Sequence, residues 1–328
     1  MEYINRRTAY HGVHALLRHQ SSSRTHILYG ATGSAFEIGR ALGNGGMGCV
    51  YLAQRWREDG GAHNREIVAL KILRPNAPAQ ARRLFYHEGA LLPRLQHPNI
   101  VRCVEYGRGR ISSIGNVDYL ALDYIAGESA EDLLHRRRDP LPLPTVLGIV
   151  AQIVDALTYL HQRGVVHCDI KPGNILLEHG APRTVLIDFG IARAPEFVGQ
   201  PIAVGTTQYM APEQANPHAA CDGRADLYAL GVVIFELLTR QRLFPRRTTT
   251  DLRQEHLVTI DVDKLASVLD PAIARVLARC LRASPDERYP TAGALLDDLR
   301  MAVCSGTCHT LNYKGGTYAS TRDTNPVR

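Results

Sequence analysis

The pattern of apolar and polar positions divides the chain into a strand-rich first third and a helix-rich remainder. In the first third, short apolar and β-branched runs alternate with turn-forming residues, as is typical of strands. Leucines between positions 84 and 95 recur at helical spacing, which predicts one helix over 79–95. The predicted strands are 50–52, 67–73, 100–106 and 117–125.

From about residue 130 onward, apolar residues recur every three or four positions. A strand-rich front followed by a helix-rich back predicts two unequal lobes. The two ends are polar and poor in apolar runs, so we expect flexible extensions at 1–36 and 302–328 around a globular part at 37–301. The predicted helices of the back are 144–163, 225–239, 271–283 and 291–302.

The composition is that of a folded globular protein. The chain has 328 residues, 45% of them apolar and 21% charged, which fits two domains or one large bilobed domain. Its net charge of +6 is weak evidence for nucleic-acid binding, because no basic run is longer than Arg136–Arg138. The longest apolar stretch, 230–238, is about half the length a bilayer requires and contains Glu236, so we predict no membrane span.

The cysteines and lysines carry more information. Seven cysteines at irregular spacing predict reduced thiols in a cytoplasmic protein, not a disulfide framework. Cys304 and Cys308 match no haem or four-ligand zinc spacing. Lysine is rare in this chain. A retained lysine can mark a site that needs a compact charge, but chance could equally explain which four lysines are present. Of the 38 basic residues only four are lysines: Lys71, Lys171, Lys264 and Lys314.

A glycine-rich segment, Gly43–Val50, fits the pattern G-x-G-x-x-G-x-V. A dinucleotide-binding turn would open a helix here and a P-loop would continue with Lys-Ser/Thr; neither follows. A hairpin that covers nucleotide phosphates needs a strand on both sides, and the sequence offers both. Lys71 lies on the next strand, and Glu88 falls on the buried face of the 79–95 helix, where a carboxylate requires a partner. We predict a Lys71–Glu88 pair; alone, it could equally be an ordinary core ion pair.

Three further motifs follow in order: His167–Asn174 (HCDIKPGN), Asp188-Phe-Gly190 and Ala211-Pro-Glu213. With the glycine-rich segment and Lys71, they resemble the signature set of protein kinases. The wording of Leu42–Gly48 and Tyr209–Gln214 is most similar to the bacterial branch of the eukaryotic-like Ser/Thr kinases. This resemblance implies an α+β, bilobal protein-kinase fold, with a small β-rich N-lobe at 37–124 and a larger α-helical C-lobe at 125–301.

The resemblance also implies a function: ATP- and Mg²⁺-dependent transfer of the γ-phosphoryl group to Ser/Thr hydroxyls of proteins, in signalling, as a non-specific serine/threonine kinase. The implied catalytic residues are Asp169, Lys171, Lys71, Glu88 and Thr206. The implied Mg²⁺ ligands are Asn174 and Asp188. The implied ATP-binding residues are Leu42, Gly43, Gly45, Gly48, Val50, Ala69, Lys71, Leu122, Asp123, Ile125, Asp132 and Leu176. Asp226, Glu213 and Arg288 resemble structural residues of the family.

The chain departs from the family at Cys168, where regulated kinases carry an Arg that pairs with a phosphorylated loop residue. Residues 191–205 also contain no Ser, Thr or Tyr. The missing receptor and the missing phosphate site agree, so we predict activity without activation-loop phosphorylation.

A nucleotide-binding pseudokinase scaffold is the main alternative, but Lys71, Asp169, Asn174 and Asp188 are all present. A small-molecule phosphotransferase would typically lack the Ala211–Glu213 segment. Nucleic-acid binding is not expected as a primary role, and the sequence leaves the oligomeric state open.

Overall fold

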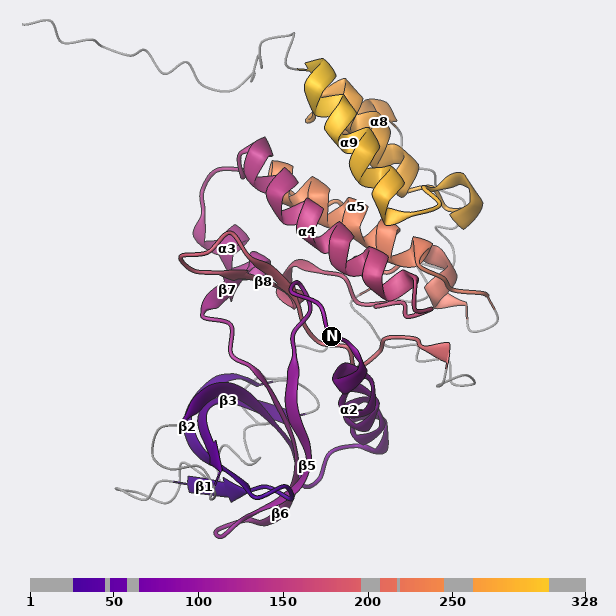
Figure 1. Cartoon of the computed structure of the whole chain (residues 1–328). Helices are drawn as coiled ribbons and strands as arrows, with labels where there is room; N and C mark the ends of the chain where they lie inside the picture. The colour runs from indigo at the N-terminus through magenta and orange to yellow at the C-terminus, as the bar shows by residue number, and fades with distance from the viewer. Residues whose placement is uncertain are drawn as a thin grey trace, which may run out of the picture.

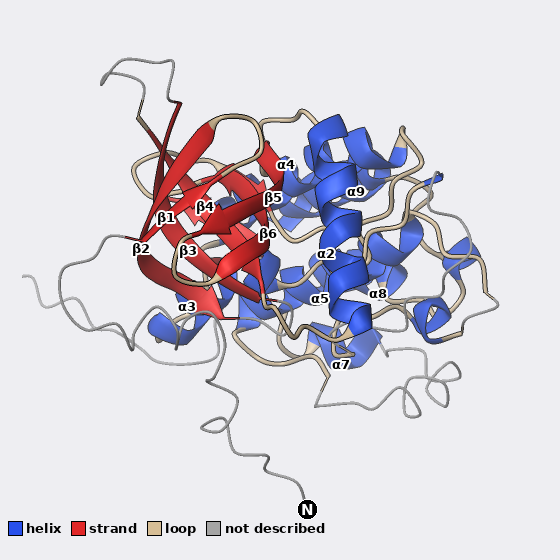
Figure 2. Ribbon diagram, turned by 90° about the horizontal axis from the view of Figure 1, so that it is seen from below, coloured by secondary structure: helices blue, strands red, loops and turns tan. Residues whose placement is uncertain are grey.

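A computed structural model of the chain describes residues 26–44, 48–57, 65–195, 207–216, 219–244 and 262–306. These residues form a strand-rich lobe and a helix-rich lobe (Figure 1). The two classes of element separate in space, with the strands of the first lobe on one side and most helices on the other (Figure 2). The bilobal α+β fold is therefore confirmed.

The N-terminal lobe is a closed antiparallel barrel in the order β1-β2-β3-β4-β6-β5. Aromatic and branched side chains such as Phe36, Tyr51 and Ile72 fill its interior. Helix α2 lies beside the barrel and continues into a short 3-10 turn at Leu92–Arg94. The strands are β1 (His26–Tyr29), β2 (Ser34–Asn44), β3 (Gly48–Arg57), β4 (Glu66–Leu73), β5 (Cys103–Ile111) and β6 (Gly115–Asp123), and α2 is Ala79–Leu91.

Glu105, on β5, is a buried carboxylate of this barrel. The Glu105 carboxylate accepts hydrogen bonds from Ser34 Oγ at 2.7 Å, Arg55 Nη2 at 3.0 Å and Tyr119 Oη at 2.5 Å. Burial alone would raise the pKa of Glu105, but these donors lower it below its usual value. The carboxylate is thus held charged although it is buried.

The C-terminal lobe is built around α5, of which 14 of 16 side chains are buried. Helix α4 lies alongside α5, and α8 and α9 pack together at the far end (Figure 1). A three-stranded sheet, β7-β8-β9, lies at the end that faces the barrel. The elements are β7 (Gly127–Ser129), α3 (Ala130–Arg136), α4 (Leu143–His161), β8 (Ile175–Glu178), β9 (Thr184–Leu186), α5 (Arg224–Thr239), α7 (Val262–Ala266), α8 (Pro271–Cys280) and α9 (Ala292–Gly306).

Among the helices that the structure describes, α4 is long and apolar enough to cross a membrane by length and composition. Eight of its side chains, including Val150 and Leu157, are buried within the lobe. It contacts α5 and α9, which is the environment of a core helix.

The expected domain limits need one correction. We expected residues 1–36 to form a flexible extension, but β1 and the first residues of β2 lie within it. Leu28 and Phe36 are fully buried in the barrel, because β1 pairs with both β2 and β5 and completes its closure. At the other end, α9 continues to Gly306, past the expected boundary at 301.

Candidate active site

A lysine on β4 and a glutamate on α2 meet at the interface of the two lobes. Lys71 Nζ lies 2.5 Å from Glu88 Oε2 and 3.7 Å from Asp188 Oδ1. The other oxygen of Glu88 accepts a hydrogen bond from the Phe189 backbone N–H at 3.3 Å. Glu88 thereby links Lys71 to the Asp188–Gly190 segment, and the predicted Lys71–Glu88 pair is present.

The carboxylates around Lys71 hold its side chain charged. Burial alone would lower the pKa of Lys71, but the carboxylates of Glu88 and Asp188 outweigh it and raise the pKa above its usual value. Burial raises the pKa of Glu88 against the pull of Lys71. The short Nζ–Oε2 contact and the Phe189 N–H both favour the carboxylate form of Glu88. Lys71 therefore presents a fixed positive charge at the lobe interface.

The loop before β8 carries the second set of polar groups. Asp169 Oδ2 accepts hydrogen bonds from Lys171 Nζ at 2.6 Å and from Asn174 Nδ2 at 2.9 Å. Asn174 Nδ2 also bonds the Asp169 carbonyl at 2.9 Å, which fixes the turn of the loop. Both side-chain contacts use Oδ2. Within the described part of the chain, Asp169 Oδ1 is therefore the oxygen left to accept from a further donor.

Buried Asp226, on the first turn of α5, holds this loop by its backbone. Its carboxylate accepts from the N–H groups of His167 at 2.9 Å and Cys168 at 2.8 Å. His161 Nε2 lies 2.9 Å from Asp226 Oδ2, so a third group helps to satisfy the buried charge. Cys168 has φ of +67°, a conformation that these bonds support. The predicted structural role of Asp226 is thus present.

Asp188 has φ of +65° and lies beside the lysines. Burial alone would raise its pKa, but Lys71 and Lys171 lower it below the usual value. The following residue, Phe189, is fully buried and packs against the His167 ring, with 4.6 Å between ring centroids. These contacts seat the segment so that Asp188 faces the lysines.

The two predicted metal ligands fit a hard divalent cation. Asp188 offers an ionised carboxylate, and Asn174 offers Oδ1, because its Nδ2 is committed to Asp169. Carboxylate and amide oxygens suit Mg²⁺, which often binds through one or two protein ligands and completes its shell with water and substrate phosphates. No cluster of three or more His, Cys, Asp or Glu ligands occurs among the described residues.

Strand register brings the predicted adenine-site residues together. Val50 pairs with Lys71 across β3 and β4, and Ala69 pairs with Leu122 across β4 and β6. Leu122 is followed by the linker to β7, in which Ile125 is buried. From the other lobe, β8 supplies Leu176, which is only partly buried.

Two predictions for this part of the site become more specific. The Asp123 N–H donates to the Arg102 carbonyl at 3.0 Å, so a contact from Asp123 to an adenine falls to its carbonyl. Asp132 is exposed and bonds Ser129, the N-cap of α3, with 2.6 Å between Ser129 Oγ and Asp132 Oδ2. A ribose contact from Asp132 Oδ2 would compete with this bond to Ser129.

The glycine-rich segment links β2 and β3, as the hairpin interpretation predicted. Leu42 and Gly43 lie near the end of β2, whose last residue is Asn44, and Gly48 begins β3. A side chain at Gly48 would place its Cβ 2.2 Å from the Ile72 carbonyl oxygen of β4, so only glycine fits there. Gly45 and Thr206, the remaining predicted site residues, lie outside the described residues.

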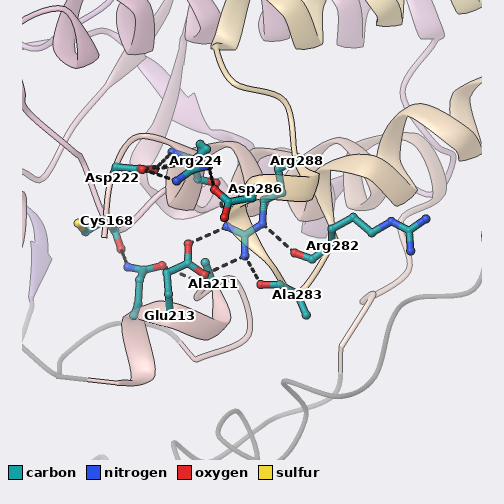
Figure 3. A network of polar contacts seen from close by, with 10 residues as sticks. Cys168, Ala211, Glu213, Asp222, Arg224, Arg282, Ala283, Asp286 and Arg288 are labelled. Atoms are coloured by element: carbon teal, nitrogen blue, oxygen red, sulfur yellow. Dashed lines mark hydrogen bonds and ion pairs between the residues drawn. The ribbon is translucent and has the colours of Figure 1, made fainter. Parts of the chain in front are cut away.

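A second network fixes the segment after the site, as Figure 3 shows. The buried Arg288 guanidinium donates to both Glu213 oxygens, at 2.7 and 2.8 Å, and also to three backbone carbonyls. Gln214 donates to the Cys168 carbonyl at 2.9 Å and accepts from the Ala211 N–H. The Arg288–Glu213 pair was predicted; the Gln214 contact was missed, and its only signal was the position of Gln214 next to Ala211–Glu213.

Comparisons with known proteins agree on one family. The family described as "Protein kinase domain" matches residues 36–299. A probable serine/threonine-protein kinase of Streptomyces coelicolor is 34% identical over 284 residues, which are 83% of this chain and 40% of that protein. Serine/threonine-protein kinase PknB of Mycobacterium leprae is 33% identical over 80% of this chain and 42% of its own length. This chain thus spans less than half the length of these two relatives.

Solved structures give the same result. The kinase domain of PknI from Mycobacterium tuberculosis superposes with a TM-score of 0.62 at 29% identity, covering 81% of this chain and 96% of that domain. A second structure of that domain gives a TM-score of 0.63 and covers 87% of this chain.

Proposed function

Because the chain belongs to the protein kinase family, in its bacterial serine/threonine branch, we propose that it transfers the γ-phosphoryl group of ATP to Ser and Thr hydroxyls of proteins. The observation that carries this proposal is the Lys71–Glu88 pair, which reaches both Asp188 and the Phe189 N–H. Phosphoryl transfer requires positioning and neutralisation of charge, and this contact aligns the groups of both lobes for those tasks.

Each group then has a task that its contacts support. Lys71 would hold the α- and β-phosphates with a charge that burial alone would have weakened. Asp169, oriented through Oδ2 by Lys171 and Asn174, would receive the hydroxyl proton of the acceptor at Oδ1. Lys171 would balance negative charge on the transferring phosphoryl group. Mg²⁺, held by Asp188 and Asn174, would neutralise the phosphate oxygens.

The acceptor class is tested by the chemistry of the product. The purified chain is incubated with ATP, Mg²⁺ and a generic basic protein, and phosphorylated residues are mapped by mass spectrometry. We expect phosphate on Ser and Thr, and none in a parallel reaction with Asp169→Asn. Phosphate on Tyr alone would contradict the Ser/Thr assignment. Nucleotide binding without any product would favour the pseudokinase scaffold, which no contact among the described residues favours.

We propose further that the site is active without phosphorylation of the loop after Asp188. Neutral Cys168 offers no charge to a phosphate, and its backbone is held instead by Asp226 and Gln214. Residues 191–205 carry no hydroxyl, so Thr206 and Thr207 are the nearest candidates.

The test for loop independence is to treat the enzyme with a phosphatase, confirm by mass spectrometry that 191–207 is unmodified, and measure the initial rate. We expect a rate within about twofold of the untreated enzyme. A large loss that recovers when Thr206 or Thr207 is rephosphorylated would refute this proposal. Three further points stay predictions: the protein substrates, a role in signalling, and the cytoplasmic location that the cysteines suggest.

A further inference from the structure

Two cysteines far apart in sequence meet behind the catalytic loop. Cys168 is buried in a small apolar cluster with Leu84, Val166 and Ile191, and Cys221 packs against the same cluster. The Cys168 and Cys221 thiols are hydrogen-bonded to each other. Both are free thiols in this structure. The two side chains are therefore in contact, which the formation of a disulfide requires.

The backbone of Cys168 is anchored on one side, and the side chain of Asp222, the residue after Cys221, is anchored on the other. Cys168 donates its N–H to Asp226 Oδ1 at 2.8 Å, and its carbonyl accepts from Gln214 Nε2 at 2.9 Å. On the other side, Asp222, next to Cys221, accepts from the backbone N–H and the guanidinium of Arg224. Arg224 in turn donates to Asp286 at 2.6 Å. Figure 3 shows Cys168 and Asp222 within one continuous network.

The two thiols differ in exposure. Cys221 is only partly buried, whereas Cys168 is buried. The hydrogen bond to Cys221 and burial raise the pKa of Cys168 well above that of a free thiol. Because Cys221 is the more exposed of the two thiols, an oxidant from solvent meets Cys221 first.

We propose that Cys168 and Cys221 form a reversible disulfide when the protein meets a peroxide. In the first step the Cys221 sulfur attacks hydrogen peroxide, the O–O bond breaks, and Cys221 sulfenic acid and one water form. In the second step the Cys168 sulfur attacks the Cys221 sulfur, the S–O bond breaks, and the departing hydroxide takes the Cys168 proton as a second water. Two thiols are oxidised by two electrons and one peroxide is reduced to two waters.

The bond would tie the residue before Asp169 to the segment that leads into α5. In kinases with Arg at this position, an ionic contact to a loop phosphate restrains the same residue; here a covalent bond takes that place. The cross-link closes a loop of roughly 50 residues, which restricts the unfolded chain and stabilises the fold. We expect the midpoint of thermal unfolding to rise by roughly 5 °C or more.

The experiment maps the bond in the full chain. Reduced protein is treated with stoichiometric hydrogen peroxide, remaining thiols are alkylated, and the chain is digested with trypsin without reductant. The bond joins peptides 164–183 and 194–224, which separate on addition of dithiothreitol. We expect this linked pair in the wild type, together with the rise in the unfolding midpoint. The readout is mass, so it does not depend on whether the proposed phosphotransfer occurs.

Two variants make the result decisive. Cys221→Ser should lose the linked peptides and the rise in midpoint, while Cys304→Ser, which removes an exposed cysteine of α9, should keep both. Peroxide-treated wild type in which bonds are confined to peptide 301–314, or in which Cys221 is overoxidised while Cys168 stays free, would overturn the proposal. So would an unfolding midpoint that rises equally in Cys221→Ser.

Discussion

Lys71 shows how a single residue combines stability and chemistry. An ammonium group in a buried position is costly without a partner, and the nearby Glu88 and Asp188 carboxylates supply the compensation. The same two contacts aim the charge at the space between the lobes, where phosphates are expected. Structural support and the proposed catalytic role therefore rest on the same contacts of Lys71, and substitution should affect the two to different degrees.

Lys71→Met should lower the phosphotransfer rate by about 100-fold or more, because it removes a preorganised charge from the transition state. The fold should survive with a loss of roughly 3 kcal/mol or less, since burial already favours protonation of the Glu88 left behind. Urea unfolding and initial rates measure the two effects separately. Lys264→Met, at an exposed lysine of α7, is the matched control and should change neither. A Lys71→Met rate within a few-fold of wild type would show that Lys71 has no part in transfer.

At the scale of elements, the pairing of β3 with β4 sets the position of both Lys71 and the glycine-rich segment. Gly48 opposes Leu73 in this register, and its Cα lies so close to β4 that a Cβ would overlap the Ile72 carbonyl oxygen. Gly43, at the other end of the segment, has no atom within 4 Å of the site of a Cβ. Two glycines of one motif thus meet different constraints.

Gly48→Ala should destabilise the protein by about 1–3 kcal/mol, because the methyl group forces β3 away from β4. It should also weaken ATP binding, since that movement displaces the segment. Gly43→Ala is the control and should cost little stability. Urea unfolding and nucleotide titration check both variants. Equal stability of the two variants would contradict the close approach of β3 to β4.

The elements that the sequence predicted well are those with long apolar periodicity. The helices predicted at 144–163 and 225–239 agree with α4 and α5 to within a residue or two at each end. Strand β1 was missed, because four residues with no clear alternation acquire strand structure only through pairing with β2 and β5. The predicted helix over 79–95 ends early in a 3-10 turn, where Pro93 follows Leu92.

The candidate site was predictable because its groups lie in short motifs. Lys71 contacts Glu88 and Asp188, and Asp169 contacts Asn174, so the predicted residues meet within two sets. What the sequence could not predict are tertiary contacts between motifs. The Gln214 bond to the Cys168 carbonyl and the Cys168–Cys221 contact depend on how two distant loops pack, and no local pattern encodes that packing.

For the molecule as a whole, stability depends on carboxylates held charged in three separate places. Glu105 lies inside the barrel, Asp188 between the lobes and Asp222 before α5. In each case neighbouring donors or cations overcome the effect of burial and lower the pKa. At these three carboxylates the unfolded chain binds protons more readily than the folded one, whereas burial acts in the opposite direction at Glu88 and Glu236.

The sign of the pH dependence follows from these three shifts. Folded pKa values lie below the ordinary values of 3.8 for Asp and 4.5 for Glu. Their contribution to stability is complete above those values and is lost as pH falls through the folded pKa values. We expect the thermal unfolding midpoint to be level near neutral pH and to fall steeply below about pH 4. Glu105→Gln should show a lower midpoint at pH 7 and a shallower acid decline; an unchanged slope would count against the charged state of Glu105.

Phosphoryl transfer from ATP to a protein hydroxyl is the task assigned to the groups around Asp169. The most direct measurement is the initial rate of transfer from γ-labelled ATP with Mg²⁺, compared between the wild type and Asp169→Asn. Both proteins should bind nucleotide and unfold at similar temperatures, because the amide oxygen of the substituted side chain can still accept from Lys171. We predict measurable transfer in the wild type and a fall of about 100-fold or more in the variant. Equal rates, or no transfer by a folded wild type that binds Mg²⁺ and ATP, would contradict this assignment.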